Sequence, residues 1–134
     1  DWVHHAISKT HVFGLVDTLE YLQKGGRIGK AQAFLGSLLQ IKPIISVKDG
    51  EVHPVERVRS RKKGLERLAE LAATFKAVQS LALFFSTNDE AVEEVAQRLG
   101  KAFPGVEIYR SRFGPVIGTY VGPGAVGVAL IEKD

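Results

Sequence analysis

The chain has 134 residues, 45% hydrophobic and 25% charged, which is the length and composition of one globular domain with its own core. It contains no cysteine, so disulfides, thiolate metal sites and cysteine nucleophiles are excluded, and a reducing, cytoplasmic location is favoured. The formal net charge of +3 attracts anionic partners without specifying one. No apolar run is long enough to cross a bilayer, so we expect no integral membrane segment.

Local patterns predict alternating strands and helices along most of the chain. The strongest signals are the Asp49-Gly50 hairpin turn and the helix caps at Asp17, Ser60 and Asp89. In chain order, the expected elements are a strand at 11–16, a helix from 17 to the glycines 25–26, a helix at 29–40, a strand beginning at 44, a return strand at 51–59, a helix at 61–77, a strand at 81–86, a helix that follows residues 87–90 and extends to 103, and strands at 106–110 and 126–131.

This order contains one hairpin and two crossovers, which fits a mixed sheet. We therefore expect an α/β fold of two layers, with a mixed six-stranded sheet and helices on one face. No internal repeat or low-complexity linker divides the chain, so residues 1–134 are expected to form a single domain. Because methionine is absent even at residue 1, we also expect the chain to be a fragment of a longer protein.

Two glycine-rich segments carry residues suited to binding. In the segment 25–29, Arg27 lies beside the start of a predicted helix, which favours either an anion site or a plain corner that needs glycine for its backbone angles. In the segment 118–125, Thr119 and Tyr120 could hydrogen-bond a carboxylate or phosphate, or the segment is a simple turn with Tyr120 half-buried.

A basic cluster follows the hairpin and suggests a second kind of site. Arginine side chains bind carboxylates and phosphates through two hydrogen bonds, so the cluster could form an anion- or nucleic-acid-binding module. It could equally be a solvated sheet edge, and the absence of interleaved aromatic residues weakens the nucleic-acid interpretation. The cluster consists of Arg57, Arg59, Arg61, Lys62, Lys63 and Arg67.

The sequence offers no convincing catalytic or metal-binding set. The histidines show no metal-ligand spacing with carboxylates on a helix, and the paired acidic residues lie on a helix face expected to be solvated. No nucleophile or general base stands out, so we expect a protein that is not an enzyme and has no metal or cofactor. A small enzyme acting on a phosphorylated substrate would need a base near Arg27, which the sequence does not supply.

Three segments resemble the C-terminal domain of the DegV family of bacterial fatty-acid-binding proteins. They are LEYLQKGGRIGKAQAFLGSLLQIKPI, DGEVHPVERVRSRKKGL and IGTYVGPGAVGV, in the family's order and at its spacing. The resemblance implies a two-domain protein in which the missing N-terminal domain and this domain enclose one long-chain fatty acid. It also implies that the acid is presented to a separate fatty acid kinase, similar to dihydroxyacetone kinase, which makes the acyl phosphate.

The resemblance also assigns roles to individual residues. Arg27 and Arg59 match arginines that the family uses at the fatty-acid headgroup and for kinase docking, and Thr119 and Tyr120 match a headgroup motif. The family usually has histidine at the position of Tyr120, and tyrosine keeps a hydroxyl donor but cannot become cationic. Acyl-chain lining is expected from Phe34, Leu35, Leu38, Leu39 and Ile44. In the isolated fragment, such apolar residues would favour a homo-oligomer.

Overall fold

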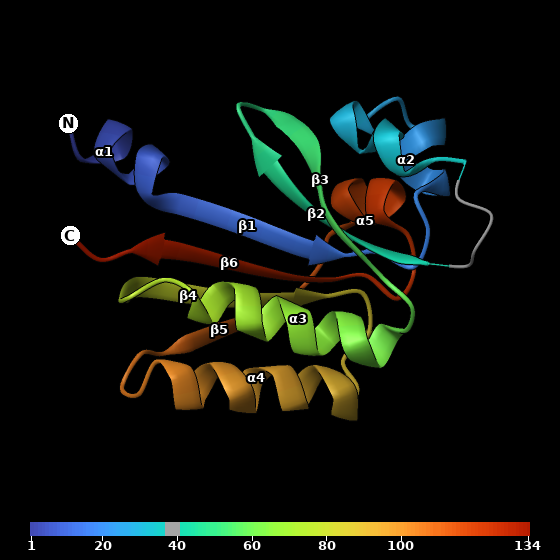
Figure 1. Ribbon diagram of the computed structural model, residues 1–134. Helices are drawn as coiled ribbons and strands as arrows, with labels where there is room; N and C mark the ends of the chain where they lie inside the picture. The colour runs from blue at the N-terminus through green and yellow to red at the C-terminus, as the bar shows by residue number, and fades with distance from the viewer. Residues whose placement is uncertain (37–40) are drawn as a thin grey trace.

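The computed structural model describes residues 1–36 and 41–134 and shows a mixed six-stranded sheet flanked by helices (Figure 1). The elements are α1 (Trp2–Lys9), β1 (Thr10–Leu15), α2 (Glu20–Lys24), the 3-10 helix η1 (Gly29–Phe34), β2 (Lys42–Lys48), β3 (Glu51–Val58), α3 (Arg61–Ala73), β4 (Val78–Phe85), α4 (Glu90–Ala102), β5 (Ile108–Arg112), α5 (Pro115–Val121) and β6 (Val126–Glu132).

The strand order is β3-β2-β1-β6-β4-β5, and each adjacent pair is antiparallel except β4 and β5, which are parallel. The strands β1 and β6 therefore lie at the centre of the sheet, although they come from opposite ends of the chain. The α/β class and the mixed six-stranded sheet predicted from the sequence are confirmed.

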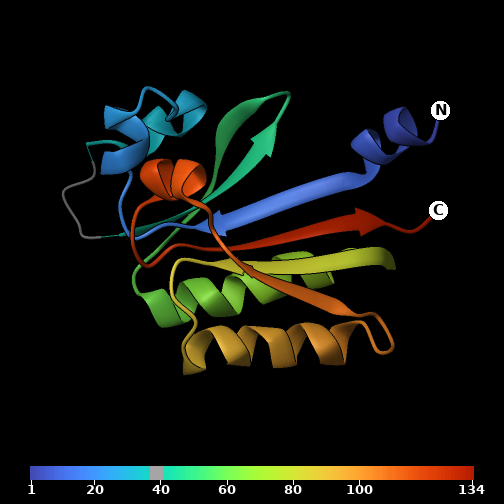
Figure 2. The same cartoon turned by 180° about the vertical axis from the view of Figure 1, so that it is seen from behind.

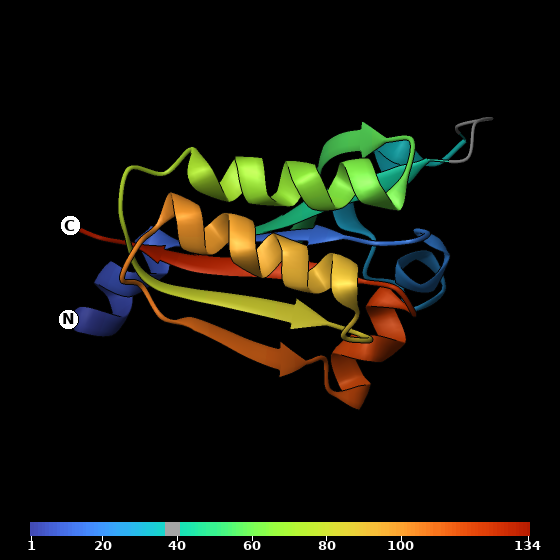
Figure 3. The same cartoon turned by 90° about the horizontal axis from the view of Figure 1, so that it is seen from below.

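The two faces of the sheet are covered differently. The long helices α3 and α4 pack across one face and bury the larger hydrophobic cluster, which includes Leu15, Leu68, Leu83 and Leu99 (Figures 1 and 3). The short helices α2, η1 and α5 lie at one end of the opposite face, on the same side as the β2–β3 hairpin (Figures 1 and 2). The prediction of helices on one face is correct for α3 and α4. It is incomplete, because the short helices cover part of the other face.

The hairpin turn and two of the three helix caps predicted from the sequence are confirmed. Asp49 and Gly50 both have positive φ, as a tight two-residue hairpin turn requires. The Ser60 hydroxyl accepts a hydrogen bond from the Lys63 backbone N–H, and the Asp89 carboxylate accepts one from the Val92 N–H. These caps fix where α3 and α4 begin.

The region after β1 differs from the prediction. Asp17 does not cap a helix; its carboxylate instead accepts a hydrogen bond from the Lys42 ammonium at 2.7 Å, and α2 begins at Glu20. The helix expected over 29–40 is a 3-10 helix that ends at Phe34, because Leu35 is extended and Gly36 has a φ of 85°. The predicted continuation through 37–40 lies outside the described residues.

Two helices were not predicted. The segment that contains His4 and His5 forms α1, whose first turn is capped by Asp1. The glycine-rich segment before the last strand contains α5, which begins at Pro115. Proline at the first position of a helix costs no hydrogen bond, so a helix can start within a sequence that otherwise indicates a turn.

Candidate functional site

An apolar groove of about 510 Å³ lies on the sheet face opposite α3 and α4. Strands β1, β2, β4 and β6 form its floor, and residues of the β2–β3 hairpin and α5 form its walls. Apolar side chains make up most of the lining. Phe84 and Phe113 are half-buried, and four others are exposed to solvent: Val12, Val47, Val116 and Ile117. The volume and the lining are those of a typical small-molecule site.

Few polar side chains reach this groove. Among the described lining residues, Arg27 is the only charged one, and Ser46 and Tyr120 carry hydroxyl groups. The guanidinium carbon of Arg27 lies 5.5 Å from the centre of the Tyr120 ring, within the range of a cation–π interaction. The structure thus brings together two of the predicted headgroup residues, one from the 25–29 segment and one from α5.

Two glycines allow α2 and α5 to approach each other closely. A side chain on Gly25 would overlap the ring of Tyr120, and one on Gly122 would overlap the ring of Tyr21. Gly122 also has a φ of 79°, a conformation that favours glycine. The aromatic side chain of each helix therefore packs on the glycine at the end of the other, and this contact fixes Tyr120 beside Arg27.

The other two predicted headgroup residues lie elsewhere. The Thr119 hydroxyl donates a hydrogen bond to the Pro115 carbonyl at 2.7 Å, and the residue is exposed on α5. Arg59 is exposed at the junction between β3 and α3. Neither residue is part of the groove lining in the described chain. Their roles at a headgroup or a kinase contact stay predictions.

Of the residues predicted to line an acyl chain, the three that the structure describes occupy two different environments, and neither is the groove. Phe34 and Leu35 pack against the smaller hydrophobic cluster beneath α2 and η1, outside the groove lining. Leu38 and Leu39 lie outside the described residues. Ile44 does not line the groove, because its side chain is fully buried with α3 on the other face of the sheet. Its neighbour Ile45 lines the groove instead.

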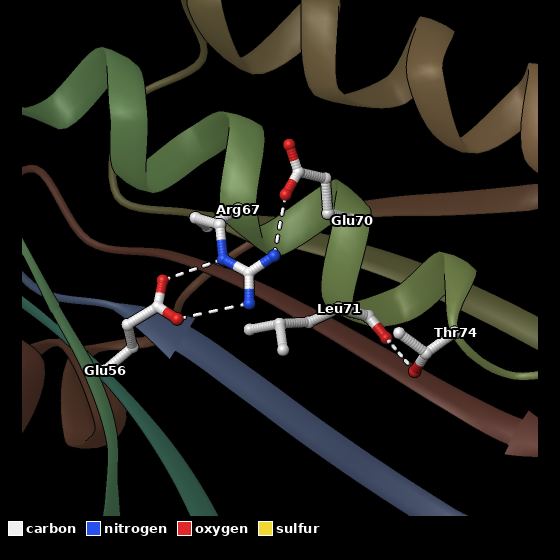
Figure 4. A network of polar contacts seen from close by, with 5 residues as sticks. All are labelled: Glu56, Arg67, Glu70, Leu71 and Thr74. Atoms are coloured by element: carbon white, nitrogen blue, oxygen red, sulfur yellow. Dashed lines mark hydrogen bonds and ion pairs between the residues drawn. The ribbon is translucent and has the colours of Figure 1, made fainter.

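The basic cluster is partly neutralised by carboxylates. Arg67 donates two hydrogen bonds to Glu56, at 2.7 and 3.1 Å, and a third to Glu70 at 2.6 Å (Figure 4). The hydrogen bonds to Glu56, followed by that to Glu70, hold the pKa of Arg67 above its usual value. Arg61 pairs with Asp89 at 3.2 Å.

A further member of the basic cluster lies against an aromatic ring. The guanidinium carbon of Arg57 is 5.2 Å from the centre of the Phe34 ring, which places it within the range of a cation–π interaction. The arginines at 57, 61 and 67 therefore have intramolecular contacts of their own. These contacts disfavour the alternative of an anion- or nucleic-acid-binding module built from the whole cluster.

Sequence reasoning missed most of the groove. Its central residues come from β1 and β6, whose pairing no local pattern indicates, and from α5, which was expected to be a turn. One signal was present: Val116 and Ile117 form an apolar pair directly after Pro115, as at the start of an amphipathic helix.

The described residues show no other kind of site. Within residues 1–36 and 41–134, no group of three or more His, Asp or Glu could hold a metal ion. The helices of the same residues are too short or too polar to cross a membrane.

Residues 1–133 match the family model for "Uncharacterised protein, DegV family". The chain belongs to the DegV family. Protein DegV of Bacillus subtilis is 40% identical over 122 residues, which cover 89% of this chain and 43% of that protein. The chain thus spans about half the length of the curated relatives it matches, as the family resemblance implied.

Solved structures of DegV proteins share the fold. A DegV family protein from Thermus thermophilus, described as fatty acid binding, has a TM-score of 0.88 at 32% identity over 98% of this chain and 49% of its own. The fatty acid binding DegV family protein from Streptococcus agalactiae has a TM-score of 0.85 at 33% identity over 99% of this chain and 48% of its own.

Proposed function

We propose that this chain is one domain of a two-domain fatty-acid-binding protein and that the apolar groove holds part of the acyl chain. The observation that carries the proposal is the groove itself, a mainly apolar space of about 510 Å³ on the sheet face opposite the long helices α3 and α4. The fatty-acid binding of the relatives from Thermus thermophilus and Streptococcus agalactiae supports the same ligand class.

The lining suits a hydrocarbon chain with a polar end. Burial of each methylene group of an acyl chain contributes about 0.8 kcal/mol, so a long chain gains much more than a short one from the same contacts. Arg27 is the charged group of the described lining and can donate two parallel hydrogen bonds to a carboxylate. The Tyr120 hydroxyl can donate one more. We assign the carboxylate end of the ligand to the side of the groove where these two residues meet.

The second domain would cover the exposed lining. Val116 and Ile117 are 72% and 51% exposed, which is unfavourable for apolar side chains that face water permanently. In the proposal, the rest of the longer protein closes over these residues and adds ligands for the carboxylate. The bound acid is then presented to a separate fatty acid kinase, with no catalytic step on this domain.

The proposal is tested on the longer protein that contains this chain. Native mass spectrometry after delipidation and addition of palmitate should show a one-to-one complex, and octanoate should bind far more weakly. Ile117→Asp places a charge in the groove wall and should abolish palmitate binding, whereas Ile7→Asp on the exposed face of α1 should bind normally. A parent protein that binds no palmitate would contradict the proposal.

A further inference from the structure

A row of paired residues crosses the floor of the groove. Ile45 of β2 pairs with Gly14 of β1, Gly14 pairs with Gly127 of β6, and Gly127 pairs with Phe84 of β4. All four residues line the groove. Two residues without side chains therefore stand between two large ones, at the place where β1 and β6 lie side by side (Figures 1 and 2).

The alternation of side chains confirms which face these glycines occupy. Leu15 and Val126, the neighbours of Gly14 and Gly127 in sequence, are buried with α3 and α4 on the other face of the sheet. Since successive residues of a strand point to opposite faces, a side chain at either glycine would point into the groove. A side chain built on Gly127 would indeed contact Phe113, which lines the groove.

The fold itself does not require glycine at these two positions. Neither glycine has a positive φ. A Cβ atom on Gly14 would lie 3.8 Å from its nearest neighbours, Ile45 Cγ1 and the Val126 carbonyl, and one on Gly127 would lie 3.5 Å from Phe113 Cζ. These are ordinary van der Waals distances. Glycine weakens the interior of a strand, and within strands it often marks a place where a ligand approaches the backbone closely. Two paired glycines on the groove floor fit this second role.

We infer that the Gly14–Gly127 pair sets the depth of the groove and so determines how closely an acyl chain lies on the sheet. Without side chains at these positions, a hydrocarbon can contact the backbone of β1 and β6 directly while Ile45 and Phe84 contact it from the sides. The pair is thus a specificity-determining feature for a long, flexible hydrocarbon ligand. This inference rests on the proposed function.

Alanine substitution tests the inference because alanine adds only one methyl group. Gly14→Ala, Gly127→Ala and the double variant should be made in the longer protein. A matched control is Gly100→Ala, which adds the same group to the exposed side of α4, where the new methyl group would meet no other described part of the chain within 4 Å. Palmitate affinity is measured by isothermal titration, and thermal unfolding reports the fold of each variant without ligand.

Each single groove variant should bind palmitate about tenfold more weakly than the parent, because the added methyl group would occupy space that the acyl chain fills. The thermal midpoint of each unliganded variant should equal or exceed that of the parent. Gly100→Ala should bind as the parent does. Unchanged palmitate affinity in folded Gly14→Ala and Gly127→Ala would overturn the inference, and so would variants that unfold. A parent that binds no palmitate would instead overturn the proposed function.

Discussion

The Arg27 guanidinium faces the ring of Tyr120, with 5.5 Å between the guanidinium carbon and the ring centre. The two residues lie near opposite ends of the sequence and meet because β1 and β6 are neighbours in the sheet and α2 packs against α5. The contact places a cation and a phenol hydroxyl at a mainly apolar groove.

Tyr120→Phe should separate the ring from the hydroxyl. Phenylalanine keeps the face that Arg27 contacts, so the free energy of unfolding in urea should change by less than about 1 kcal/mol. Palmitate affinity should fall because one donor to the carboxylate is lost, whereas affinity for hexadecanol should change less. An equal loss for palmitate and hexadecanol would argue that Tyr120 contacts only the hydrocarbon.

Gly25→Ala should destabilise the domain through a clash with Tyr120. Gly25 has a φ of −81°, so alanine brings no backbone strain, and the cost is the displacement of the ring. We expect a loss of about 1–3 kcal/mol in the free energy of unfolding. In a double-mutant cycle, Tyr120→Ala should remove most of the additional loss caused by Gly25→Ala. Strict additivity of the two changes would show that the ring is not what alanine displaces.

Arg67→Met should weaken the contact between β3 and α3. Its guanidinium holds Glu56 through two hydrogen bonds, but both side chains are about one-third exposed, so solvent screens the pair. Urea unfolding should show a loss of about 0.5–1 kcal/mol. Arg98→Met is the matched control, since Arg98 lies 4.0 Å from Glu66 and is 52% exposed. If the two variants lose the same stability, the bidentate geometry contributes nothing.

Arg59→Ala should affect the kinase step more than fatty-acid retention. Arg59 is exposed at the end of β3 and is not part of the described groove lining, so its removal should leave palmitate affinity near that of the parent. Formation of acyl phosphate with a purified fatty acid kinase should fall markedly. Equal losses of palmitate affinity and kinase coupling would refute this division of roles.

The sequence predicted the elements that depend on neighbouring residues. Asp49-Gly50, Ser60 and Asp89 act within one turn, so the hairpin and the starts of α3 and α4 could be recognised from the sequence alone. Asp17 does not cap a helix, and its carboxylate is hydrogen-bonded to the distant Lys42 instead. A single sequence does not show whether a side chain will bind a neighbouring backbone N–H or a residue that is distant in the sequence.

The groove could not be predicted because it depends on strand pairing. Ile44 and Ile45 are chemically equivalent neighbours, and only the register of β2 against β1 decides which one faces the groove. Gly14 and Gly127 lie far apart in the sequence and become neighbours on the groove floor only through the pairing of β1 with β6. Arg27 and Tyr120 were candidates from their glycine-rich segments and from the family resemblance, but their mutual contact depends on the three-dimensional arrangement.

The most direct test of the account is to locate a bound acyl chain. A palmitate analogue with a photoreactive diazirine near its methyl end is bound to the longer protein and irradiated, and the labelled peptides are identified by mass spectrometry. If the groove holds the acyl chain, labels within this chain should fall on β1, β6 and α5, at residues such as Val12, Ala129 and Ile117 that line the groove. Labels confined to α3 and α4, or to the other half of the protein, would contradict the account.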